Sequence, residues 1–106
     1  MSRDKVLSFL GLATKAGKVV SGEFMTAKAV KEGSACLVIL PLDASDNTKK
    51  KFRNMCDYYQ VPIYFYSDKI SLGNAIGKEF RASVGVIDQG FANGLIDKMV
   101  MESGRN

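Results

Sequence analysis

Apolar residues recur along the chain with helical spacing in some segments and as short strand-like runs in others. Near the N-terminus they lie three and four residues apart, which is typical of an amphipathic helix, at Val6, Leu7, Leu10 and Ala13. We expect this helix to begin after a cap at Ser2 and to end near Ala16, with Gly17 just past its end. One amphipathic helix therefore opens the chain.

A short strand, a turn and a second helix follow in close succession. Val19 and Val20 predict the strand, and Ser21 and Gly22 lead into a helix over about 23–32 that Gly33 terminates. Such a junction leaves backbone N–H groups exposed at the start of a helix.

The middle of the chain predicts a buried strand and a third helix. Residues 36–40 are apolar on both alternating faces, as in a central strand covered on each side, and Pro41 ends the run. Ser45 or Asp46 can cap the next helix, which we expect to reach about residue 59. Its inward stripe is expected at Phe52, Met55, Cys56 and Tyr59.

The C-terminal part continues the alternation. We expect a strand at 63–66, a short helix at 71–76, a strand at 84–87 and a last helix at 91–101 capped by Asp88. Strands that alternate with helices predict an α/β layered domain. Because no repeat, linker or low-complexity tract interrupts the 106 residues, we expect a single domain over 1–106.

The composition argues against catalysis and metal binding. Histidine is absent, which removes the commonest general base and the commonest metal ligand. Cysteines and carboxylates form no cluster at ligand spacing. We therefore expect no metal and no catalytic residue.

The chain also lacks the marks of a membrane or secreted protein. Its apolar runs are far shorter than the roughly 20 residues that span a bilayer, and the N-terminus has no apolar signal core. Cys36 and Cys56 are too few for a disulfide framework. We expect a cytoplasmic protein in which both cysteines are inert packing residues. Gap-filling in a core is likewise the expected role of four methionines, Met25, Met55, Met99 and Met101.

The turn at residues 21–23 is the strongest candidate site. It combines a tight turn at a helix start with basic residues at Lys18, Lys28 and Lys31, an arrangement that attracts phosphate. The alternative is a helix cap beside a solvated basic face. The basic run at 49–51 with Arg53 has the same two interpretations, on a different helix.

Several short motifs resemble one family in order and spacing. The chain is similar to the kink-turn RNA-binding superfamily of ribosomal proteins, the L-seven-Ae and L-thirty-e type, in Gly22, KAV at 28–30, Gly33, LVIL at 37–40 and LGNAIG at 72–77. It most resembles the small bacterial YlxQ-type branch, in GLA at 11–13, VVSGE at 19–23, NTKKK at 47–51 and DQGFAN at 88–93. The resemblance covers nearly the whole chain.

The resemblance implies a fold, an activity and two contact surfaces. It implies a three-layer α/β/α sandwich around a mixed four-stranded sheet, RNA binding, no enzymatic activity and no cofactor. The first RNA-binding surface carried over by position comprises Lys18, Ser21, Gly22, Glu23, Phe24, Met25 and Lys28, flanked by Lys31. The second comprises Ile76, Gly77, Lys78, Glu79, Phe80 and Arg81.

The sequence departs from the family pattern at both surfaces. The family commonly has a polar pair two and three residues after the motif glycine, where this chain has Phe24 and Met25. Neither side chain can hydrogen-bond a guanine edge, although the Glu23 carboxylate can accept from guanine N–H groups. The usual Arg-Pro pair of the second loop is also replaced, and Phe80 can stack on a splayed base.

Two functional hypotheses follow. The first is a non-enzymatic protein, expected as a monomer, that binds kinked structured RNA of ribosomal or regulatory type alongside ribonucleoprotein partner proteins. The second is a protein interaction module of the same fold that has lost RNA binding. It would use Phe24 and Met25 as an apolar docking patch.

Overall fold

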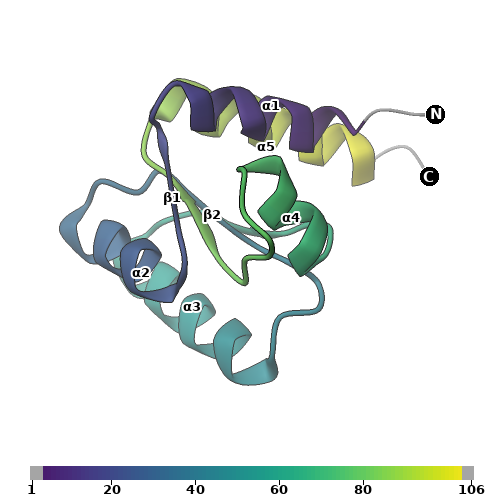
Figure 1. Ribbon diagram of the computed structural model, residues 1–106. Helices are drawn as coiled ribbons and strands as arrows, with labels where there is room; N and C mark the ends of the chain where they lie inside the picture. Colours follow the sequence, from purple (N-terminus) through teal and green to yellow (C-terminus); the bar gives the residue numbers. More distant parts are fainter. Residues whose placement is uncertain (1–3, 104–106) are drawn as a thin grey trace.

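The computed structural model describes residues 4–103, in which helices and strands alternate as the sequence predicts (Figure 1). In chain order the elements are α1 (Lys5–Lys15), β1 (Val19–Ser21), α2 (Glu23–Glu32), β2 (Leu37–Leu40), α3 (Asp46–Tyr59), β3 (Ile63–Phe65), α4 (Lys69–Ala75), β4 (Val84–Val86) and α5 (Gln89–Ser103).

The four strands form one mixed sheet in the order β1-β4-β2-β3. Strand β4 is antiparallel to both β1 and β2, whereas β2 and β3 are parallel, with Ile39 opposite Tyr64. The turn after β1 and the loop before β4 consequently meet at the same end of the sheet.

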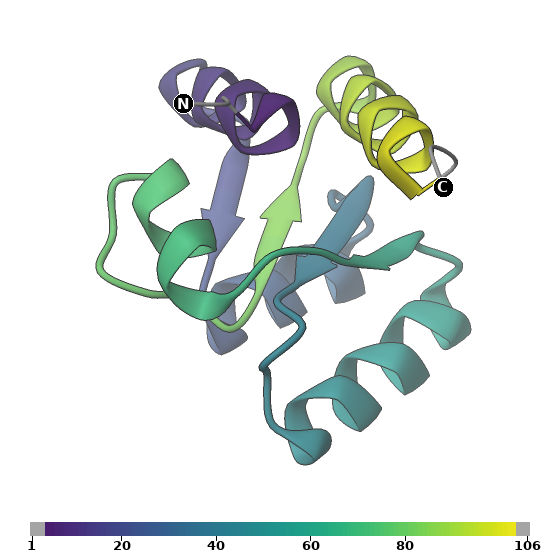
Figure 2. The ribbon, with the colours of Figure 1, turned by 90° about the vertical axis from the view of Figure 1, so that its right-hand side faces the viewer.

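Helices cover both faces of the sheet. Figure 2 shows α1 and α5 on one face and α3 on the other, and α4 packs on the α1 side. Strand β2 serves both cores, because Leu37 and Ile39 point to one face and Val38 and Leu40 to the other. This confirms the predicted three-layer α/β/α sandwich around a mixed four-stranded sheet.

Three helices start elsewhere than predicted, and one of them is α5, which begins at Gln89 rather than at Phe91. The expected cap at Ser2 lies outside the described residues, and α1 begins after Asp4, whose Oδ1 accepts from the N–H of Leu7 at 2.9 Å. Helix α4 begins two residues before the predicted Ser71. The carboxylate of Asp68 caps it by accepting from the N–H of Ser71 at 2.8 Å, and this bond lowers the pKa of Asp68.

Some expected core positions are exposed. Tyr59 does not belong to the inward stripe of α3, which consists of Phe52 and Cys56 with Met55 half-buried. Tyr59 lies in the last turn of α3, where its ring packs on the exposed Tyr58, and the next residue adopts the left-handed conformation that ends the helix. The gap-filling role predicted for Met25 and Met101 is also wrong, because both are exposed.

The described part of the chain, residues 4–103, contains no helix long and apolar enough to cross a membrane.

Candidate nucleic-acid interface

A glycine turn connects β1 to α2. Gly22 has φ +89° and ψ 158°, a conformation that is essentially restricted to glycine. Its N–H donates to the carbonyl of Ser83 at 3.0 Å, and its carbonyl accepts from the N–H of Thr26 at 3.0 Å. A Cβ on Gly22 would meet no protein atom within 4 Å. The hydrogen bonds with Ser83 and Thr26 fix the turn, and the space that a Gly22 side chain would enter is open.

Helix α2 starts without a capping side chain, since Gly22 is its N-cap. At the start of each other helix of the described chain, a capping side chain accepts a hydrogen bond from a backbone N–H of the first turn. The capping residues are Asp4, Ser45, Asp68 and Asp88. The first N–H groups of α2 are thus left to solvent or to a partner. Together with the positive end of the helix dipole they favour an anion.

The structure places the two predicted surfaces side by side. Ser21 of β1 pairs with Val84 of β4, which brings the 76–83 loop next to the Gly22 turn. Arg81 links the two, because its Nε donates to Ser21 Oγ at 2.9 Å and its Nη1 donates to the carbonyl of Phe80 at 2.8 Å. Turn and loop therefore form one continuous surface.

Gly73 positions the second loop. A Cβ at Gly73 would lie 2.4 Å from the Cα of Phe80, so only glycine lets the loop fold back on α4. The N–H of Arg81 donates to the carbonyl of Lys69 at 3.0 Å and fixes the returning chain. Sequence reasoning missed this role, although a glycine inside a predicted helix is a signal of close packing.

Most of the predicted site residues face solvent, but one does not. Phe24 is 75% exposed, Phe80 56% and Met25 45%. Ile76 was placed on the second surface by position, and this was wrong, because it is 6% exposed and packs in the core with Leu72. Ser21, Gly22 and Arg81 are half-buried, and the remaining predicted residues are exposed: Lys18, Glu23, Lys28, Lys31, Gly77, Lys78 and Glu79.

Two ion pairs shape the charge around the turn. Lys28 lies one helical turn from Glu32, with 3.8 Å between Nζ and Oε2. The Nζ of Lys51 on α3 contacts Oε2 of Glu23 in the first turn of α2. Lys51 was assigned to a separate basic region, yet the fold brings it to the candidate interface. No local sequence signal links positions 28 residues apart.

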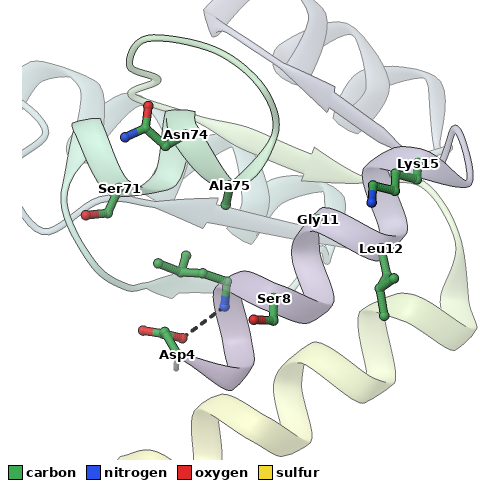
Figure 3. Close-up of a pocket in the computed structure, with 9 residues that line it drawn as sticks. Asp4, Ser8, Gly11, Leu12, Lys15, Ser71, Asn74 and Ala75 are labelled. Carbon is green, nitrogen blue, oxygen red and sulfur yellow. Dashed lines mark hydrogen bonds between the residues drawn. The ribbon is translucent and has the colours of Figure 1, made fainter. Parts of the chain in front are cut away.

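Two of the surface grooves of the described residues involve α1, α2 or α4. A shallow apolar one of about 290 Å³ runs along α2 and is lined by Phe24, Ala27, Lys28, Lys31 and Glu32. A larger one of about 760 Å³ lies between α1 and α4 (Figure 3). Its one lining carboxylate among the described residues is Asp4, and both oxygens of Asp4 accept hydrogen bonds, from Leu7 N–H and the Tyr66 hydroxyl.

The two cysteines of the described residues differ in burial, since Cys56 is buried and Cys36 is half-buried. Burial raises the pKa of Cys56 to about 11, so the thiol is protonated and unreactive at neutral pH. No group of three metal-ligating side chains is found within the described range.

Comparisons with known proteins identify the family. The model of the "Ribosomal protein L7Ae/L30e/S12e/Gadd45 family" matches residues 4–96. The chain belongs to this family. Among its members, a Bacillus subtilis protein named "RNA-binding protein YlxQ" is 49% identical over 96 residues, covering 91% of this chain and 96% of the relative. A protein of the same name from Enterococcus faecium is 37% identical over 91 residues, covering 86% and 87%.

Solved structures share the fold of this chain. A Bacillus halodurans protein of unknown function has a TM-score of 0.90 and 42% identity, covering 92% of this chain and 99% of its own. The "15.5kD RNA binding protein" of Giardia lamblia has a TM-score of 0.76 at 18% identity, covering 95% and 90%, and shows that the fold is shared.

Proposed function

We propose that this protein is a non-enzymatic RNA-binding protein that recognises kinked structured RNA of the kink-turn type, in a ribosomal or regulatory RNA. The names of the bacterial relatives support RNA as the partner. The observation that carries the proposal is the turn at Gly22. Helix α2 starts there without a capping side chain, the space next to Gly22 is open, and the 76–83 loop lies beside the turn. We further propose that the chain acts as one domain and as a monomer.

The bound RNA places its backbone at the start of α2. The free N–H groups of the first turn donate hydrogen bonds to a phosphate, and the exposed Lys18 and Lys28 add charge-assisted contacts. An unkinked RNA helix has a major groove too narrow for a protein element, so a kink is required for α2 to enter. The Phe80 ring, held on the adjoining loop, stacks on an extruded base.

Recognition in this proposal depends on RNA shape more than on guanine edges. Phe24 and Met25 project from the first turn of α2, where polar readers would otherwise reach the G·A pairs. Apolar side chains can pack against bases and sugars but cannot discriminate between base edges. Glu23 remains available as an acceptor when it parts from Lys51.

A salt titration tests RNA binding. A kink-turn duplex should bind with log affinity falling against log salt at a slope of about −2 to −4, since roughly three to five phosphates are engaged. A straight duplex of equal length and composition is the control and should bind more weakly. Absence of binding even at low salt would contradict the proposal.

Altered G·A pairs test the shape argument. Wild type should discriminate poorly against a kink-turn whose G·A pairs are replaced while the kink is preserved, as checked by fluorescence transfer between the stems. The variant Phe24→Asn with Met25→Glu should improve discrimination by about 1–3 kcal/mol, the value of a good bidentate base contact. Strong rejection by wild type, with weaker binding by the double variant, would show that Phe24 and Met25 permit full readout.

A protein interaction module is the second candidate. It is favoured by the adjacent exposure of Phe24 and Met25 and by the apolar groove along α2. It predicts that the RNA titration fails while Phe24→Ser, which removes the most exposed of these rings, abolishes binding of a protein partner.

A further inference from the structure

A contact between α2 and α3 extends the basic surface around the Gly22 turn. Lys51, in the second turn of α3, places its Nζ against the carboxylate of Glu23, the first residue of α2. The two helices pack on each other on the same face of the sheet (Figure 1). The N-terminal half of α3 is therefore continuous with the proposed RNA interface.

The two sides of α3 have different surroundings. Arg53 turns toward β3, where its guanidinium carbon lies 4.8 Å from the centroid of the Phe65 ring. Lys51 lies on the other side, toward α2. Helical spacing groups Lys51 with residues 47, 54 and 58, which are three, four or seven positions away. These three residues are exposed, and they are Asn47, Asn54 and Tyr58.

The stripe has the composition of a nucleic-acid contact surface. It carries a lysine, two amides and Tyr58, which is 79% exposed and packs edge-to-face on Tyr59 at 4.8 Å between ring centroids. Lys51 and Tyr58 lie seven residues apart, or roughly 10 Å along the helix axis.

Resting on the proposed function, we propose that the RNA surface continues from the start of α2 onto this stripe of α3, with Lys51 contacting a backbone phosphate of the stem that leaves the kink. In the free protein Glu23 holds Lys51 beside the interface. Because both side chains are about half exposed, 47% for Lys51 and 58% for Glu23, their pairing is weak. A phosphate can replace the carboxylate at little cost.

The test compares two neighbouring lysines on the same helix. Lys51→Ala should weaken binding to a kink-turn RNA by about three- to tenfold and reduce the magnitude of the salt slope by about one, as expected for the loss of one phosphate contact. Lys50→Ala removes the same charge from an exposed position 100° around the helix, and should change neither quantity appreciably. Lys51→Arg should retain binding. Equal losses for Lys51→Ala and Lys50→Ala would overturn the inference.

A second arm separates phosphate contact from simple charge neutralisation. If Lys51 only masks the charge of Glu23, Lys51→Ala should cost nothing in a Glu23→Gln background, and that result would also overturn the inference. We expect the full loss to persist there. The effect of Lys51→Ala on RNA affinity should vanish when the stem that Lys51 contacts is shortened, since the contacted phosphate is then removed. Shortening the other stem should leave the effect unchanged.

The wild-type titration distinguishes failure of the proposed function from failure of the inference about α3. If wild type binds no RNA, the proposed function and this inference fail together. If wild type binds the kink-turn and Lys51→Ala binds equally well with an unchanged salt slope, only the inference about α3 fails.

Discussion

The conformation of Gly22 makes a strong prediction about RNA binding. Substitution by alanine forces a side chain into a backbone region with φ +89° and ψ 158°. Such strain costs about 1–3 kcal/mol. Because domains of this size are stable by roughly 5–15 kcal/mol, the Gly22→Ala protein should remain folded. Its melting temperature should fall by roughly 4–8 °C for each kcal/mol of strain.

The loss of RNA affinity should exceed what the loss of stability explains. The added Cβ meets no protein atom within 4 Å, so it projects into the space that the RNA is proposed to occupy. We expect at least a tenfold weaker complex, equivalent to about 1.4 kcal/mol. The larger Gly22→Val should abolish detectable binding.

Gly33 provides a matched control at the other end of α2. It has φ +83° and also has no protein atom within 4 Å of a Cβ, but it terminates the helix away from the turn. Gly33→Ala should cost about 1–2 kcal/mol through the left-handed backbone. Thermal unfolding and RNA titration of both variants separate the two effects.

The comparison has a clear refuting outcome. If Gly22→Ala binds kink-turn RNA as tightly as Gly33→Ala does, with both proteins more than nine-tenths folded at the assay temperature, then no RNA approaches the turn. The start of α2 would then not be the interface.

Three further predictions concern other parts of the fold. Gly73→Ala should lower the free energy of unfolding in urea by about 1–3 kcal/mol and weaken RNA binding, because its Cβ would collide with the backbone of Phe80; unchanged values would contradict the close packing. Lys28→Ala should weaken RNA binding more than Lys50→Ala, by about 1 kcal/mol in filter binding, and a reversed order would place the RNA on another face. Burial raises the pKa of Cys56 from 9.0 to about 11. The stability that this thiol contributes is therefore present below pH 9 and is lost as the pH rises toward 11. Cys56→Ala should remove that part of the pH dependence of the melting temperature.

The alternation of helices and strands could be predicted because its determinants are local, whereas the mixed four-stranded sheet was expected from the family resemblance. The apolar pattern of residues 37–40 identifies a strand buried on both faces, and Gly17 and Gly33 mark helix ends by their positive φ. The start of α4 was misplaced because Asp68 and Ser71 are both good caps in the sequence, and only the observed hydrogen bond between them decides.

The candidate site was harder to predict because its geometry is non-local. The apolar side chain of Ile76 indicates a core residue, and Ile76 is buried. It was assigned to the RNA surface only because of its position in the family motif. Met25 was expected in the core because it lies on a helix, but the buried face of α2 consists of Thr26, Ala29 and Val30, and Met25 lies outside that face. The contact of Lys51 with Glu23 depends on how α3 packs on α2.

At this candidate interface the backbone is held by hydrogen bonds, whereas the exposed side chains are free to adapt to a partner. The Gly22 turn is fixed by the Ser83 carbonyl, and the loop is fixed by Arg81 through Ser21. A surface held in this way loses little conformational freedom on binding, which favours affinity for a partner of matching shape. The exposed rings of Phe24 and Phe80 can stack on any base, since every base has a π-face. A rigid frame with sequence-tolerant contacts suits a protein that selects a kinked RNA by its shape.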